Sequence, residues 1–235
     1  MSRIGIVLQA RASSSRLPGK VLRPLLGRPM LGWIVERLRL CQEVDTVILA
    51  TSDRADDDVV AALGTQLGTP VFRGDLDDVL DRYCACARQF GLNAVVRATG
   101  DNPFVDWEEA DRLVRLFRSG TWDYASAFPS FGSGLPIGLG VEIMSAQALE
   151  RSWREGKHLH HREHVNEYIQ ENPALFPQTV LTAPPEKTAP ELSFTVDTAE
   201  QFAEAEALMA AHMAEGGTAG RATTEWLIAR IQGGR

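Results

Sequence analysis

Residues 8–20 read LQARASSSRLPGK, and this segment indicates both the type of fold and the place of a ligand site. It follows the apolar run Ile4 to Leu8 (IGIVL), whose short length and β-branched residues predict a buried strand. The loop after the strand holds Arg11, Arg16 and Lys20, three consecutive serines and a Pro-Gly turn. In an open α/β sheet, ligands bind at the carboxyl ends of the strands, where backbone N–H groups and fixed positive charge hold anions. The segment therefore predicts a polyphosphate site, although it matches neither the GxxxxGK[ST] nor the GxGxxG pattern.

The composition is that of an ordinary globular protein. The chain has 235 residues, 44% of them hydrophobic and 23% charged, which fits one large domain. Its net charge of −7 argues against nucleic acid as a partner, because binding to a phosphate backbone requires a basic surface. Three cysteines, an odd number within helical patterns, indicate the thiols of a cytoplasmic protein. No apolar run approaches membrane-spanning length, and Met1-Ser2-Arg3 leads directly into a strand, so we expect no membrane association.

Strand-like and helix-like segments alternate up to residue 126. After the first strand, the patterns predict strands at 44–51, 70–72, 93–98 and 122–126, with helices at 30–40, about 55–67, 76–90 and 107–117. This alternation predicts an α/β fold with a mainly parallel sheet flanked by helices, because right-handed crossovers place helices on both faces.

The alternation breaks at Phe128. Residues 129–143 begin with the Gly/Pro-rich run PSFGSGLPIGLG and are expected to form a loop or hairpin, at the cleft or in a contact between subunits. Later segments predict helices at 145–153, 158–172, from 198 and at 224–231, and strands at 180–181 and 192–196. We find no repeat and expect residues 1–235 to form a single domain.

Two aspartates follow predicted strands and are candidates for binding a metal. Asp101 comes after the strand at 93–98, and Asp197 comes after the segment at 192–196. A bound triphosphate requires a divalent cation, and Mg²⁺ is held by one or two carboxylates together with phosphate oxygens and water. Each aspartate has an alternative role as the cap of a following helix.

Five ordered segments resemble one enzyme family. They are QARASSSRLPGK at 9–20, RGDLDDVLDRY at 73–83, RATGDNPF at 97–104, REHV at 162–165 and TVDT at 195–198. They resemble the sugar-acid cytidylyltransferases, which include CMP-KDO synthetase and CMP-acylneuraminate synthetase. The likeness is closest to the spore-coat polysaccharide biosynthesis F-type members and extends from residue 4 to about residue 205.

The resemblance implies a glycosyltransferase-A-like nucleotidyltransferase fold, a homodimer, and the use of CTP with Mg²⁺ as cofactor. An acceptor oxygen would attack the α-phosphorus of CTP, giving a CMP-linked product and pyrophosphate. Arg16, Lys20 and Asp101 would be catalytic, and Asp101 and Asp197 would hold the metal. The resemblance further implies nucleotide binding by Gln9, Ala10, Arg11, Ser14, Ser15, Arg16, Lys20, Thr99 and Gly100. Arg73 is expected either to contact the base or ribose or to form a surface ion pair with Asp75 or Asp77.

The acceptor is expected to be a small acid: a sugar acid, a sugar phosphate or a phosphonate. Arg162, Glu163 and His164 match the family's Arg-Glu-His-Val block and are expected to face the acceptor. Glu142 falls where F-type relatives carry an acid, and it is also expected to contact the acceptor. Those relatives usually have Gly-x-Asp-Val-Glu there, whereas this chain has Gly140 in place of the aspartate.

Two questions stay open from the sequence. The histidines between His158 and His164 could bind a metal, but zinc would need a further ligand, so hydrogen-bonded or exposed imidazoles are the simpler expectation.

A nucleotide-sugar-binding glycosyltransferase or a non-catalytic relative on the same fold is the alternative function. The nearest D-x-D motifs, such as Asp75-x-Asp77, look like solvated acids at helix starts. A scaffolding role is difficult to reconcile with three cations on one strand-end loop.

Overall fold

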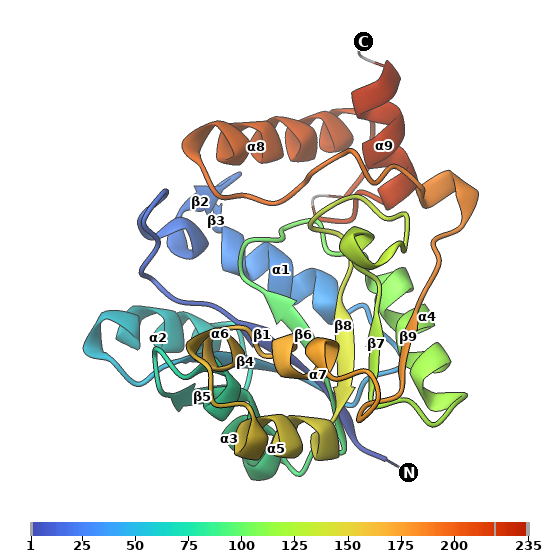
Figure 1. Cartoon of the computed structure of the whole chain (residues 1–235). Helices are drawn as coiled ribbons and strands as arrows, with labels where there is room; N and C mark the ends of the chain where they lie inside the picture. Colours follow the sequence, from blue (N-terminus) through green and yellow to red (C-terminus); the bar gives the residue numbers. More distant parts are fainter. Residues whose placement is uncertain (1, 219, 234–235) are drawn as a thin grey trace.

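The fold is built on one central sheet. The structure is a computed structural model that describes residues 2–218 and 220–233 (Figure 1). Its seven-stranded sheet has the order β5-β4-β1-β6-β8-β7-β9. The strands are β1 (Ile4–Gln9), β4 (Thr46–Ser52), β5 (Val71–Gly74), β6 (Ala94–Thr99), β7 (Tyr124–Ser126), β8 (Glu142–Ser145) and β9 (Gln178–Val180). β8 runs antiparallel to β6 and β7, whereas all other neighbouring pairs are parallel. A small hairpin, β2 (Pro24–Leu25) and β3 (Arg28–Pro29), lies apart from this sheet.

Helices cover both faces of the sheet. This is required because the apolar side chains of β1 point alternately to the two faces. Ile4, Ile6 and Leu8 pack into one core, while Val7 points to the other face. The first face is covered by α1 (Met30–Leu38), α2 (Asp58–Gln66) and α4 (Trp107–Arg118). α8 (Ala199–Ala214) and α9 (Thr224–Gly233) add side chains to the same apolar core but lie beyond the sheet, at the top of Figure 1. The second face is covered by α3 (Val79–Phe90), α5 (Ala146–Glu155) and α7 (Glu167–Glu171), with α3 and α5 side by side (Figure 1). These two apolar layers confirm the predicted α/β fold with a mainly parallel, helix-flanked sheet.

The strand order changes direction at β1, and this change creates a cleft. From β1 the chain continues to β4 and β5 on one side, and then places β6 on the other side of β1. In doubly wound sheets, such a switch in direction opens a crevice at the carboxyl ends of the two strands involved. The loops after β1 and β6 therefore meet there.

Two predicted elements were wrong. The helix predicted at 158–172 is split into α6 (Leu159–Glu163) and α7, because His164 has extended backbone and the next residue, Val165, is fully buried. The strand predicted at 192–196 has only one bridge, between Ser193 and Ile137, because its other backbone groups bond to loops. Residues 142–143, at the end of the predicted loop or hairpin, belong to β8, which pairs antiparallel with β7.

The remaining connections include four 3₁₀ turns. They are η1 (Lys20–Leu22), η2 (Ala55–Asp57), η3 (Pro129–Phe131) and η4 (Pro185–Lys187). Residues 129–140 form a loop that pairs with the segment 183–194 through backbone hydrogen bonds, and it does not line the cleft described below. Within residues 2–218 and 220–233, none of the helices has both the length and the apolar character needed to cross a bilayer.

Candidate active site

A cleft of about 880 Å³ lies at the carboxyl ends of β1 and β6. Most of the residues that the sequence predicted for a site line this one cleft. They are Gln9, Ala10, Arg11, Ser14, Ser15, Arg16, Lys20, Thr99, Gly100, Asp101, Arg162, Glu163, His164 and Asp197. Two predicted residues, Arg73 and Glu142, do not line it.

Lys20 is at the centre of the charged groups in the cleft. Its Nζ donates hydrogen bonds to Asp197 Oδ1 at 2.8 Å and to the backbone oxygen of Val196 at 2.9 Å. Asp101 Oδ2 lies 3.8 Å from the same nitrogen. Arg16 Nη2 lies 2.9 Å from the second oxygen of Asp197. Two cations from the loop after β1 thus face two carboxylates from distant parts of the chain.

Asp197 is held beside Asp101 by hydrogen bonds between their two segments, and the segment before Asp197 is not a regular strand. The Val196 N–H donates to the Asp101 carbonyl oxygen at 2.8 Å, and the Thr195 hydroxyl lies 3.0 Å from Asn102 Oδ1. The alternative role of these aspartates as helix caps is wrong. Asp106 caps α4 and Thr198 caps α8, which leaves the Asp101 and Asp197 carboxylates in the cleft.

The loop after β1 is held in shape by a buried carboxylate. Asp57, in η2, accepts hydrogen bonds from the Ala12 N–H at 2.6 Å and from the Ser52 side chain. The Gly19 N–H bonds back to the Ala12 carbonyl at 3.0 Å, and Gly19 has a φ of +68°, which favours glycine. These bonds position the cationic side chains of the loop before any ligand binds.

Gly100 allows the loops after β1 and β6 to approach closely. A Cβ at this position would lie 3.0 Å from the Ala10 Cβ and 3.2 Å from the Gln9 carbonyl oxygen. A larger residue would push the β1 loop away from Asp101. Thr99 donates a hydrogen bond to Asp101 Oδ1 and accepts one from Asn102 Nδ2 at 2.9 Å, which fixes the orientation of the carboxylate.

Arg97 is a cleft residue that the sequence predictions missed. Its Nη1 lies 2.6 Å from Glu142 Oε1, and the Glu142 side chain is fully buried. Glu142 also accepts hydrogen bonds from the Tyr124 hydroxyl and, at 2.7 Å, from Asn166. Burial alone would lower the pKa of Arg97, but the charge of Glu142, its hydrogen bond to Arg97 and the nearby Tyr83 and Tyr124 together raise that pKa above its usual value. Glu142 thus lies behind the cleft and holds a permanently charged arginine in its wall.

The cleft is lined by two more arginines, Arg162 of α6 and Arg82 of α3. Arg162 Nε donates to Asp78 Oδ2 at 2.8 Å, and its Nη1 donates to the Trp153 carbonyl at 2.8 Å. The pKa of Arg82 is lowered by burial and also by the charge of Arg11. Asp78 and Arg82 lay within the RGDLDDVLDRY segment, so a signal for them existed, but no role was predicted for either residue.

Arg73 is outside this cleft. Its Nη1 lies 2.6 Å from Asp58 Oδ1, and its Nε donates to the Ser52 carbonyl at 3.0 Å. A surface ion pair is therefore present, but its partner is Asp58 and not the predicted Asp75 or Asp77. A role of Arg73 in contacting the base stays a prediction.

The fold and the cleft together define a nucleotidyltransferase. The carboxyl edge of the sheet presents a preformed cationic loop beside paired carboxylates, which is the arrangement that transfer of a phosphate-linked group requires. A sequence model of the cytidylyltransferase family matches residues 4–221, and the chain belongs to this family.

Similar proteins agree with this assignment. The chain is 35% identical over 213 residues to the spore coat polysaccharide biosynthesis protein SpsF of Bacillus subtilis, covering 88% of this chain and 87% of SpsF. A cytidylyltransferase structure from Leptospira borgpetersenii superposes with a TM-score of 0.90 at 27% identity, covering 100% of this chain and 95% of that one. CMP:2-keto-3-deoxy-manno-octonic acid synthetase, solved in complex with CTP, has the same fold, with a TM-score of 0.67 at 22% identity over 90% of this chain and 100% of that one.

Proposed function

We propose that the chain is a Mg²⁺-dependent cytidylyltransferase that transfers CMP from CTP to a small acidic acceptor and releases pyrophosphate. The main support is the convergence of Asp101 and Asp197 on Lys20, at the loop that carries Arg11 and Arg16. This arrangement provides cations for a triphosphate and carboxylates for its metal within one cleft.

The carboxylate pair fits Mg²⁺ in its chemistry. Asp101 and Asp197 offer only oxygen ligands, which Mg²⁺ prefers, and both are partly exposed to the cleft. The metal, when bound, would neutralise charge on the triphosphate and polarise the α-phosphoryl group. Lys20 and Arg16 now neutralise Asp197, and they would turn to the phosphate oxygens when the nucleotide binds. Their charge would then stabilise the departing pyrophosphate.

The acceptor would bind between β6 and α6. Glu163 and His164 are exposed at the cleft wall, and the Arg97 guanidinium is held there by Glu142. Arginine favours binding to carboxylates, phosphates and phosphonates, which supports an acidic acceptor. Arg162 contributes by joining α6 to Asp78, the N-cap of the neighbouring α3, so it shapes the acceptor wall. Glu163 or His164 could take the proton of the attacking hydroxyl.

The test is a pyrophosphate-release screen. Purified protein is incubated with Mg²⁺ and each nucleoside triphosphate in turn, against a panel of sugar acids, sugar phosphates and phosphonates. We expect release with CTP and an acidic acceptor, and its loss when EDTA is added. Release with UTP or GTP instead would overturn the cytidine assignment, whereas no release with any combination would contradict nucleotidyl transfer.

The glycosyltransferase alternative has less support. Asp75 of the Asp75-x-Asp77 motif lines the cleft, but its Oδ1 already accepts the N–H groups of Asp77 and Asp78, both at 2.8 Å. The carboxylate is therefore used to build the turn before α3. Hydrolysis of a nucleotide sugar without pyrophosphate release would favour this alternative.

A homodimer, with residues 129–140 at the contact, is also part of the proposal, and sedimentation velocity tests it.

A further inference from the structure

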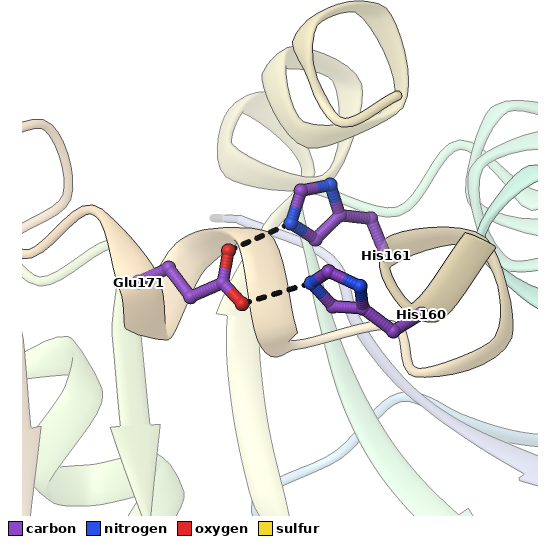
Figure 2. A group of neighbouring side chains, drawn as sticks. All are labelled: His160, His161 and Glu171. Atoms are coloured by element: carbon purple, nitrogen blue, oxygen red, sulfur yellow. Dashed lines mark hydrogen bonds and ion pairs between the residues drawn. The ribbon is translucent and has the colours of Figure 1, made fainter. Parts of the chain in front are cut away.

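Two histidines of α6 and one glutamate of α7 converge on the side of α6 that faces α7 (Figure 2). His160 Nε2 lies 2.9 Å from Glu171 Oε1, and His161 Nε2 lies 2.7 Å from Glu171 Oε2. The three ligand atoms lie within 4.8 Å of one another. None of these residues lines the nucleotide cleft. We propose that His160, His161 and Glu171 form a second metal site, specific for a divalent transition-metal ion of the zinc type.

The donor set selects the ion. Two imidazole nitrogens and one carboxylate oxygen suit Zn²⁺ and its neighbours in the transition series, whereas Mg²⁺ requires oxygen ligands. Three protein ligands leave a fourth position of a tetrahedral site for water. The site is therefore chemically distinct from the Asp101 and Asp197 pair, and the two ions would not compete.

The geometry needs only a small adjustment to admit an ion. Ligand atoms around a tetrahedral Zn²⁺, at about 2.0–2.1 Å from the metal, lie roughly 3.3 Å from one another. The hydrogen bonds of 2.7 and 2.9 Å would thus open by about half an ångström. The Glu171 side chain is 47% exposed and the His160 side chain is 44% exposed, which leaves room for this movement and a path for the ion.

Metal binding requires a change of proton position at His161. Its Nδ1 accepts a hydrogen bond from the His158 N–H at 3.3 Å, so its proton now resides on Nε2 and is donated to Glu171. The ion would replace this proton, the proton would move to Nδ1, and the His158 N–H would turn toward solvent. A hydrogen bond of 3.3 Å lies beyond the usual range for N–H donors, so its loss opposes metal binding only weakly.

The ion would connect two elements that have little support of their own. α6 and α7 each have five residues, well below the length at which a helix is stable alone. α6 also supplies Arg162, Glu163 and the adjoining His164 to the cleft. A bound ion would therefore fix the wall assigned above to the acceptor. Only this consequence rests on the proposed function; the site itself does not.

Isothermal titration of EDTA-treated protein with Zn²⁺, in the presence of millimolar Mg²⁺, tests the site without any measurement of activity. We expect one equivalent of Zn²⁺ per chain, and a rise in melting temperature with added Zn²⁺. His160→Asn and Glu171→Gln, both at exposed side chains, should each weaken binding at least about tenfold. His158→Asn is the matched control, because this neighbouring histidine lies outside the three-ligand group and should leave Zn²⁺ affinity unchanged.

Two results would overturn the proposal. One is the absence of stoichiometric Zn²⁺ binding by the unsubstituted protein. The other is an equal loss of affinity in His158→Asn and His160→Asn, which would indicate general binding to surface imidazoles. Cobalt is an independent probe: tetrahedral Co²⁺ should give visible absorption that His160→Asn abolishes. Because each readout is binding, failure here leaves the cytidylyltransferase proposal untouched.

Discussion

Lys20 Nζ contacts Asp197 Oδ1 at 2.8 Å, although the two residues are 177 positions apart in the chain. This ion pair links the cationic loop after β1 to the segment that precedes α8. Asp101 lies on the other side of the same nitrogen, at 3.8 Å. The three groups form a preassembled charge cluster, in which a metal-bound triphosphate would replace the direct contact between lysine and carboxylate.

Replacing either carboxylate of this cluster should abolish turnover. Asp101→Asn and Asp197→Asn keep the shape of the side chain but remove the charge that a metal requires, so we expect pyrophosphate release to decrease at least roughly a hundredfold. Arg16→Ala should have a similar effect. Asp56→Asn, at an exposed aspartate outside the cleft, is the matched control. Near-normal turnover by a folded Asp101→Asn protein, with folding checked by circular dichroism, would remove Asp101 from the mechanism.

Arg11 and Arg73 should differ in their contribution to CTP binding. Arg11 lines the cleft, whereas Arg73 is engaged by Asp58 outside it. Hydrogen bonds to charged groups contribute about 1.5–3 kcal/mol, so Arg11→Ala should raise KM for CTP by roughly 10-fold or more. Arg73→Ala should change it by less than about 3-fold. Equal increases, measured by steady-state kinetics at saturating acceptor, would instead support contact between Arg73 and the base.

The sequence predicted the part of the cleft around the loop after β1 well, because the residues of that part are close together in the chain. A β-branched strand followed within twelve residues by Arg11, Arg16 and Lys20 specifies both the strand and the loop. Asp101 and Asp197 could also be identified individually from the sequence, because each follows a predicted strand. Their meeting depends on the hydrogen bond between Val196 and Asp101, which no local pattern encodes.

The residues proposed to bind the acceptor were harder to predict, because their contacts are with residues far away in the chain. Glu142 looked like a ligand, yet it is buried against Arg97 on the neighbouring strand. Arg162 matched a family block, but its guanidinium is occupied by Asp78, which is 84 residues away. Glu171 was missed as the partner of His160 because the histidine stretch was predicted to be one helix. The break at His164 lets α7 turn back toward α6.

Glu142→Gln should destabilise the protein strongly. The substitution leaves the mostly buried Arg97 without a counter-charge, which typically costs about 3–5 kcal/mol. Glu150→Gln is the matched control, because Glu150 pairs with Arg88 at the surface, where an ion pair contributes about 1 kcal/mol or less. Urea denaturation of both variants measures the difference. Similar losses in the two proteins would mean that the Arg97 and Glu142 pair is compensated by other groups.

The stability of the fold should decrease at alkaline pH because its three cysteines are buried, and the two in α3 can be tested as a pair. Burial raises the pKa of Cys84 and that of Cys86, each to about 12 in the folded chain. In the unfolded chain these thiols ionise near about pH 8.5. Above that pH the unfolded state loses protons that the folded state keeps, so the free energy of unfolding decreases as pH rises. Each thiol should contribute a loss of about 2 kcal/mol by about pH 10.

The double variant Cys84→Ala/Cys86→Ala isolates this contribution. It should be somewhat less stable at neutral pH, because two small cavities replace the thiols, but its stability should decrease less steeply between about pH 8.5 and 10. Lys187, whose pKa is raised by the surrounding carboxylates of Asp106 and Glu108 despite its burial, loses its stabilising charge only at higher pH. Its contribution is common to both proteins and cancels in the comparison. Guanidinium denaturation at several pH values, with reductant present, gives the two slopes; equal slopes would show that the thiols are not protected from ionisation in the folded chain.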